Sequence, residues 1–233
     1  MSGVTAMIPT SESELTALLQ KLPFWEHLTA EEASWLPGQA SLNRYPAGAI
    51  LHSAQLECIG LLQICTGSLR VFLLSEEGRE ITLYRLGPGE LCVLSASCVL
   101  HSITFDVHID AVEDCTVLQT GASALSRLMQ ENIHVEVFAY RLIAEHFSDV
   151  MWTMQQILFM SFDRRLASFL LEETEVSGSD RLKMTHEQIA RLLGSAREVV
   201  SRMLKYFSEE GMVSLGRGTI QITDREKLKA LLS

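Results

Sequence analysis

One stretch of heptad-spaced apolar residues, between positions 131 and 160, constrains the fold more than any other part of the sequence. Its apolar positions repeat at intervals of three and four over three heptads: Val137, Tyr140, Ala144, Phe147, Met151, Met154 and Leu158. This spacing predicts one long helix with an a/d seam, which is typical of helices that pair. A second apolar stripe can pack on the chain's own core: Phe138, Leu142, Ile143, Val150 and Ile157. We therefore predict a homodimer joined along the seam.

The sequence before this helix, from about 38 to 120, predicts short strands. Apolar or alternating runs such as GAILHS, REITLYRL and CTVLQT are separated by turn clusters such as SEEGR and LGPGEL. Their spacing of roughly 8–12 residues is typical of an all-β sandwich or barrel. A hairpin turn is expected at residues 76–78. Ser11 or Ser13 can cap a short helix before the strands, and Ser123 can cap another after them.

The sequence after the long helix predicts helices joined by a tight turn. Ser161-Phe162-Asp163 interrupts the seam, and Asp163 can cap the helix RRLASFLLEE. Thr185 can cap HEQIARLLG, where Gln188 gives a near capping box. Gly194 ends that helix, and REVVSRMLKYFSEEG forms the next. MVSLGRGTIQITD predicts two strands around a Gly-Arg-Gly turn, so the order is helix–turn–helix–wing.

Charge is distributed unevenly between the two parts of the chain. The formal charge of the whole chain is −10. Residues 1–160 carry 7 Lys and Arg against 18 Asp and Glu, whereas residues 161–233 carry 12 against 11. The C-terminal part is therefore the better candidate for binding an anion such as DNA.

The helix from about 196 to 209 is the candidate DNA-reading element. A buried stripe of Val200, Met203, Leu204 and Phe207 leaves charged residues on the opposite face. Two arginines there can each donate a bidentate pair to guanine, and a glutamate can accept from a cytosine amine. Lys205 and Arg217 suit phosphates. The predicted DNA contacts are Arg197, Glu198, Ser201, Arg202, Lys205, Thr185 and Arg217.

The segment THEQIARLLGSAREVVSRMLKYFSEEGMV resembles the helix–turn–helix of the cAMP receptor protein/fumarate–nitrate regulator (CRP/FNR) family of bacterial transcription regulators. The resemblance covers essentially the whole chain and implies an α+β fold. The implied domains are a cyclic-nucleotide-binding-like β-roll (double-stranded jelly roll) at 1–125, a dimerisation helix at 126–160 and a winged helix–turn–helix at 161–233. A hinge is expected at Phe162 and Asp163.

The resemblance also implies partners for the chain. The R-E-x-x-x-R pattern of the family falls on Arg197, Glu198 and Arg202. In the CRP-like branch these positions read TGTGA-type half-sites, so a palindrome of that kind is expected. The implied partners are double-stranded DNA, a second copy of the chain and RNA polymerase.

The family's known effectors fit the sequence poorly. Members that bind cAMP use Gly-Glu and, about ten residues later, Arg-Ser; these positions fall here on Val93-Leu94 and Phe105-Asp106. No arginine is available for the phosphate, so control by cAMP is not expected. Residues 1–57 contain no Cys, which excludes an iron–sulfur cluster of the family's type.

Three kinds of effector remain open. One is a small apolar or aromatic ligand, and another is thiol oxidation at Cys92 and Cys98. The third is haem in a gas sensor: Cys92 aligns with a thiolate ligand of the carbon-monoxide-sensing haem members, whose His two residues on is Leu94 here. No other metal site is predicted. The expected pocket comprises Leu91, Cys92, Val93, Leu94, Cys98, Phe105, Phe147 and Met151.

Other classes of protein are disfavoured. No Gly-rich phosphate loop, HExxH or GxSxG motif occurs, so we do not expect an enzyme. No apolar run reaches the ~18 residues of a membrane span, and the N-terminal residues lack the basic start and apolar stretch of a signal peptide, so a cytoplasmic protein with no membrane partner is expected. The five Cys lack CxxC spacing and are expected to be thiols. The rival class is an effector-binding β-roll module that acts through protein partners.

Overall fold

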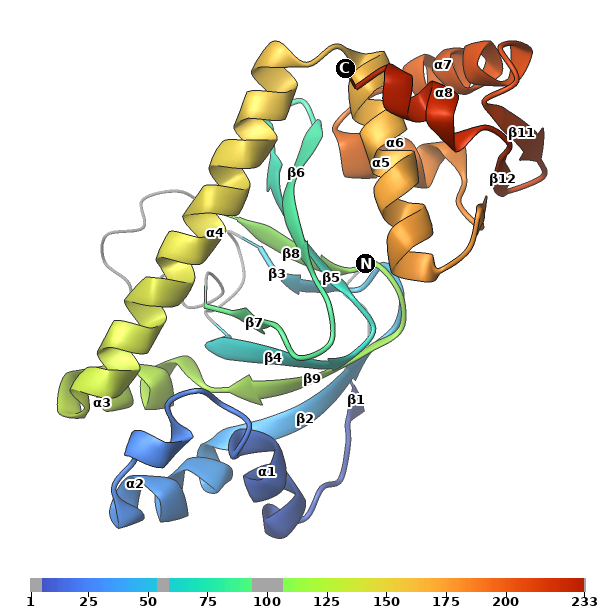
Figure 1. The fold of residues 1–233 in the computed structure, drawn as a ribbon. Helices are drawn as coiled ribbons and strands as arrows, with labels where there is room; N and C mark the ends of the chain where they lie inside the picture. Colours follow the sequence, from blue (N-terminus) through green and yellow to red (C-terminus); the bar gives the residue numbers. More distant parts are fainter. Residues whose placement is uncertain (1–5, 54–58, 94–106, 233) are drawn as a thin grey trace. The chain divides into compact units, whose positions relative to one another are not determined.

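The computed structural model (Figure 1) describes three stretches of the chain, residues 6–53, 59–93 and 107–232. The described chain divides into two compact units. The first is formed by Met1–Leu74 and Leu83–Val150, and the second by Ser75–Thr82 and Met151–Ser233. The first unit holds two sheets and several helices, and the second holds further helices and a small sheet. The predicted α+β class is confirmed.

Short helices occupy residues 12–39 of the first unit: α1 (Glu12–Leu19), η1 (Trp25–His27), α2 (Ala30–Trp35) and η2 (Leu36–Gln39). Ser11, and not Ser13, caps α1, and Thr29 caps α2. In each case a glutamate three residues on bonds back to the N–H of the cap residue, which completes a capping box. These bonds satisfy N–H groups that the first turn of a helix leaves without partners.

Two sheets form the β domain. The first has the order β1-β2-β9-β4-β7, with bounds β1 (Ala6–Met7), β2 (Ala40–Tyr45), β9 (Cys115–Thr120), β4 (Leu61–Thr66) and β7 (Leu91–Cys92). The second has the order β3-β8-β5-β6, with bounds β3 (Ile50–His52), β8 (His108–Ala111), β5 (Leu69–Leu74) and β6 (Glu80–Leu86). Gly78 takes a φ of 79° between β5 and β6, so the hairpin expected at residues 76–78 is confirmed.

Alternation along β4 explains why the first unit has two apolar clusters. Leu62 and Ile64 pack with residues of the second sheet, such as Val71 and Ile109. Leu61, on the other face, packs with residues of the helices. Successive side chains of a strand point to opposite faces, so the sheet that contains β4 is covered on both sides.

Two helices follow the β domain, α3 (Ala122–Glu131) and α4 (Ile133–Phe159). The N-cap of α3 is Gly121 and not the predicted Ser123. Asn132 separates the helices: its backbone is extended, and its side-chain amide donates to the His27 carbonyl at 3.0 Å and to the Glu32 carboxylate at 3.1 Å. The dimerisation helix expected from 126 therefore begins at 133. Within the described ranges, no helix is both long and apolar enough to cross a membrane.

The second unit is built on a small three-stranded sheet with the order β10-β12-β11. Its elements are α5 (Phe162–Ser177), β10 (Arg181–Leu182), α6 (His186–Leu193), α7 (Arg197–Glu209), β11 (Val213–Gly216), β12 (Thr219–Ile222) and α8 (Arg225–Ala230). The predicted N-cap of α5 is wrong by two residues: Ser161 is the N-cap, and the predicted residue, Asp163, lies in the first turn of the helix. A hydrogen bond from Ser161 lowers the pKa of Asp163 there. Neither β10 nor α8 was predicted.

Candidate nucleic-acid interface and ligand cavity

A capped helix, a glycine turn and a second helix form the helix–turn–helix. Thr185 accepts a hydrogen bond from the Gln188 N–H at 3.2 Å, and Gln188 Oε1 accepts from the Thr185 N–H at 2.8 Å. Gly194 ends α6 with a φ of 61°, a conformation that favours glycine. Only residues 194–196 separate α6 from α7. The short turn fixes the direction in which α7 leaves α6.

The buried face of α7 anchors it in the core of the second unit. Val200, Leu204 and Phe207 are fully buried. They pack with apolar residues of α5, α6 and the small sheet, such as Leu170, Ile189 and Ile220. The opposite face of α7 is therefore held in a fixed orientation and remains accessible.

The charged residues predicted to read DNA lie on that accessible face. Arg197, Glu198 and Arg202 are exposed, and the structure gives them no hydrogen bond or ion pair with any described residue. Lys205 is also exposed and forms a surface ion pair with Glu209 at 3.7 Å. Such an exposed pair is worth at most ~1 kcal/mol, so it can be exchanged for a phosphate.

Ser201 differs from the other predicted contacts because it is half-buried and already has a partner. Its Oγ lies 2.8 Å from Nδ1 of His186, the first residue of α6. Burial and the nearby Arg197 guanidinium lower the pKa of His186. The sequence analysis did not predict that His186 contacts Ser201. The only sequence feature that pointed to His186 was its position next to the helix cap Thr185. The bond ties the start of α6 to the middle of α7.

The wing closes a concave site beside α7. Arg217 lies exposed in the turn between β11 and β12. A cavity of about 460 Å³ is lined by Thr185, His186 and Arg197 together with Gly216 and Gly218 of the wing. The structure thus brings the starts of α6 and α7 and the wing around one hollow, whereas Lys205 and Arg202 lie further along α7.

The seam of α4 is exposed in the single chain. Its six large apolar residues are between 39 and 65 % exposed: Val137, Tyr140, Phe147, Met151, Met154 and Leu158. Ala144 is exposed as well. The opposite face is buried and carries Val135, Ala139, Leu142 and His146. Of the second stripe expected from the sequence, only Leu142 is buried; Phe138, Ile143 and Val150 are half-buried against the core.

Of the residues predicted to form the effector pocket, those that the structure describes are not brought together. Leu91 and Val93 pack with the helices, whereas Cys92 is buried between the sheets. Phe147 and Met151 are exposed on α4. The remaining predicted members lie outside the described residues: Leu94, Cys98 and Phe105.

The described cysteines, Cys65, Cys92 and Cys115, form no disulfide bonds with one another. Burial raises the pKa of Cys65, and burial together with Asp114 raises the pKa of Cys115 to about 11. Cys92 is fully buried. Among the described residues, no group of three His, Cys, Asp or Glu could hold a metal ion.

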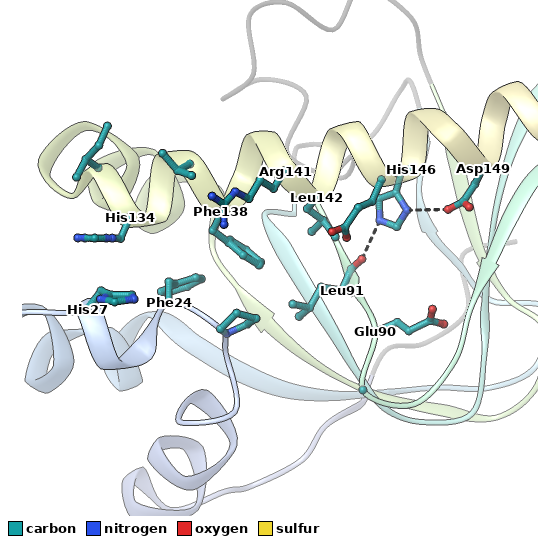
Figure 2. A pocket seen from close by; sticks show the side chains of 15 residues that line it. Phe24, His27, Glu90, Leu91, His134, Phe138, Arg141, Leu142, His146 and Asp149 are labelled. Carbon is teal, nitrogen blue, oxygen red and sulfur yellow. Dashed lines mark hydrogen bonds and ion pairs between the residues drawn. The ribbon is translucent and has the colours of Figure 1, made fainter.

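A different cavity, of about 670 Å³, lies within the first unit (Figure 2). Its walls come from the segment after α1, the turn before β7 and one side of α4. Phe24, His27, His134 and Phe138 lie at one end, and Glu90, His146 and Asp149 lie at the other (Figure 2). Of the residues that line this cavity, the sequence analysis predicted only Leu91 as a pocket residue. The others could not be predicted as such, because the walls combine segments more than 100 residues apart in the chain.

Both units match known protein families. Residues 164–231 match the Crp-like helix-turn-helix domain, and residues 42–132 match the cyclic nucleotide-binding domain. The second match concerns the fold of the β domain. The first begins within α5 and extends through α8, so it includes every residue of the exposed charged face described above.

Several relatives span most of the chain. The crystal structure of a regulator assigned to the Crp/Fnr family from Eubacterium rectale is 43% identical, covers 91% of this chain and 99% of its own, and has a TM-score of 0.88. The cyclic AMP receptor protein of Thermus thermophilus is 27% identical over 90% of this chain and 96% of its own length. The transcriptional activator protein anr of Pseudomonas aeruginosa is 28% identical over 71% of this chain and 70% of its own length. With its helix–turn–helix and these relatives, the chain belongs to the Crp/Fnr family of DNA-binding transcription regulators.

Proposed function

We propose that the chain acts as a homodimer that binds a TGTGA-like DNA palindrome and responds to an effector other than cAMP. The observation that carries this proposal is the exposed face of α7, where Arg197, Glu198 and Arg202 have no partner among the described residues. Charged groups held on a rigid helix without internal partners are available for base edges in the major groove.

The other predicted contacts would fix the register of the helix on the duplex. Lys205 and the exposed Arg217 can each reach a phosphate, and Thr185 lies at the start of α6, where N–H groups favour an anion. Ser201 would contribute its hydroxyl while His186 holds it in place. RNA polymerase is the proposed protein partner of the bound dimer.

The exposed seam of α4 supports the homodimer. A contiguous row of large apolar side chains on one helix is costly in water and is typical of a protein interface. Pairing two copies along the seam would bury it and place two α7 helices on one DNA palindrome, whose symmetry matches that of the dimer. Met160 and Ser161 alone separate α4 from α5, and we propose that Phe162 and Asp163 form the hinge through which an effector changes the spacing of the two α7 helices.

An effector other than cAMP is supported by the absence of basic residues from one stretch of the sequence. No Lys or Arg occurs between Arg85 and Arg127, the stretch in which cAMP-binding relatives carry theirs. Val93, which stands at the first cassette position, is fully buried among apolar residues. The burial of Cys92, one of the two cysteines of the predicted thiol switch, favours a bound ligand, because a thiol buried in apolar surroundings is poorly reactive.

The test is fluorescence anisotropy with a labelled TGTGA palindrome at several salt concentrations. We expect salt-dependent binding that Arg197→Ala weakens by ~1–3 kcal/mol per half-site, while Arg181→Ala, an exposed position outside the interface, leaves it unchanged. Each of the two guanines of the half-site is replaced in turn, and one of the two replacements should weaken the wild type more than it weakens Arg197→Ala. Equal affinity of both proteins for every sequence would refute base reading.

The effector proposal is tested on the same protein. Titration with cAMP should leave DNA affinity unchanged, and a cAMP-dependent increase would refute this part of the proposal. A Soret band in freshly purified protein would instead assign haem, with Cys92 as a candidate ligand.

A further inference from the structure

The cavity of the first unit has a mixed chemical lining that suits a small ligand. Its volume of about 670 Å³ falls in the range of roughly 300–1,000 Å³ that small-molecule sites occupy. All of its walls belong to the first unit. Apolar residues such as Leu91 and Leu142 line its middle, and charged groups from α4 and the turn before β7 surround them.

Two opposite charges on α4 face this cavity without partners. Arg141 and Glu145 both line it, one helical turn apart. Neither forms an ion pair or a side-chain hydrogen bond with any residue in the described parts of the chain. Residues four apart on a helix have Cβ atoms roughly 5–6 Å from each other. A ligand that carries an anion and a cation on one carbon can therefore pair with both groups at once.

One end of the cavity is aromatic. The rings of Phe24 and Phe138 lie 5.1 Å apart at an angle of 59°, and the rings of His27 and His134 stack at 4.1 Å. Figure 2 shows these four side chains together, with Arg141 and Leu142 between them and the opposite end. Such a group of rings favours a planar aromatic side chain through offset or edge-to-face contacts.

The other end of the cavity is acidic. Glu90, Glu145 and Asp149 line it, and Arg141 is the only Lys or Arg in the described lining. This excess of carboxylates disfavours a phosphate and favours an ammonium group. We propose that the cavity binds a zwitterionic α-amino acid with an aromatic side chain: the ring packs against the Phe24 and Phe138 pair, the carboxylate pairs with Arg141, and the ammonium pairs with Glu145.

His146 connects this site to both the β domain and α4. Its Nε2 lies 3.0 Å from the Leu91 carbonyl, and its ring stacks on Tyr84 at 4.4 Å and 5°. His146 and Leu91 also line the cavity. A ligand that contacts them favours one arrangement of α4 on β7, so it can alter the seam. This regulatory consequence rests on the proposed function, whereas ligand binding itself does not.

The test is isothermal titration calorimetry of the full chain without DNA, using three probes. L-Phenylalanine carries both charges, phenethylamine lacks the carboxylate, and 3-phenylpropionate lacks the ammonium. We expect one L-phenylalanine per chain, and each of the other probes to bind at least tenfold more weakly. Arg141→Gln should weaken L-phenylalanine at least tenfold and abolish its advantage over phenethylamine. Glu145→Gln should abolish its advantage over 3-phenylpropionate.

The control is Glu136→Gln, on the same helix but outside the cavity lining, which should change nothing. If the protein is folded and millimolar L-phenylalanine gives no heat of binding, the proposal is overturned. A second subunit that covered the cavity would give the same result, and that outcome also overturns the proposal. If Arg141→Gln lowered the affinity for all three probes by the same factor, that result would also overturn the proposal. Because no DNA is present, a failure of DNA binding is detected separately, in the anisotropy experiment.

Discussion

The helices α4 and α7 are both amphipathic, but they expose opposite kinds of surface. Helix α7 packs its apolar stripe into the core, with Val200, Leu204 and Phe207 fully buried, and exposes charged residues such as Arg197 and Arg202. Helix α4 buries one apolar face and leaves a second one exposed, including Phe147 and Met151. The exposed charged face of α7 therefore suits a charged partner such as DNA, whereas the exposed apolar face of α4 suits another apolar surface.

The comparison teaches that the two exposed faces have separable roles. The seam of α4 should determine how many chains assemble, and the charged face of α7 should determine what the assembly binds. Variants in one face should leave the other property unchanged. The predictions below test this separation.

The largest effect is expected from Met151→Asp in the seam. Pairing would bury two carboxylates without partners, and each uncompensated buried charge costs on the order of 3–5 kcal/mol. We expect the variant to be a folded monomer by analytical ultracentrifugation, with the binding to the palindrome lost. Gln155→Asp, at a nearby exposed polar position of α4, serves as the control and should remain dimeric. A dimeric Met151→Asp would show that the seam is not the interface.

The next largest effect is expected from Phe207→Ala in the buried stripe of α7. Phe207 is fully buried, and truncating such a ring costs about 3–5 kcal/mol of unfolding free energy. Urea unfolding should show an early transition of the second unit, while sedimentation should still report a dimer. If the dimer also dissociated, the two faces would not be separable.

A smaller effect is expected from Thr185→Ala at the start of α6. Loss of the hydroxyl removes its hydrogen bonds with the N–H and Oε1 of Gln188 and should cost ~1 kcal/mol of unfolding free energy. Thr185→Ser keeps the hydroxyl and should retain most of the stability. Thermal unfolding of the three proteins measures the difference, and equal stabilities would argue against the capping box.

The smallest effect is expected from the pH dependence that His186 confers. Burial and Arg197 lower its pKa below the ordinary value of 6.5, so the unfolded chain binds the proton more readily than the folded one. Stability should therefore fall as the pH drops below about 6.5 towards the lowered pKa, and should not change on this account above pH 7. His186→Gln should flatten that part of a plot of melting temperature against pH. A slope unchanged in the variant would assign it to other groups.

Sequence reasoning predicted elements whose signals are local. The cap at Thr185, the turn at Gly194 and the buried stripe of α7 depend on neighbouring residues, and all three are present. The cap of α5 was predicted two residues late, because Ser161 and Asp163 are both capable of capping and only the end of α4 decides between them.

The candidate ligand site could not be predicted in the same way. Phe24 and Phe138 are 114 positions apart in the sequence, and only the packing of the segment after α1 against α4 brings their rings within 5.1 Å. Asn132, which starts α4 by bonding to the His27 carbonyl, is likewise an ordinary polar residue in the sequence. Tertiary contacts of this kind have no periodic signal.

The measurement that tests the central claim most directly is analytical ultracentrifugation of the protein alone, with a duplex carrying the TGTGA palindrome and with a duplex carrying one half-site. We predict a species of about twice the 26.0 kDa chain mass, two chains on each palindromic duplex, and weaker binding to the half-site duplex. A 26.0 kDa monomer that binds both duplexes equally, one chain to each, would contradict the account.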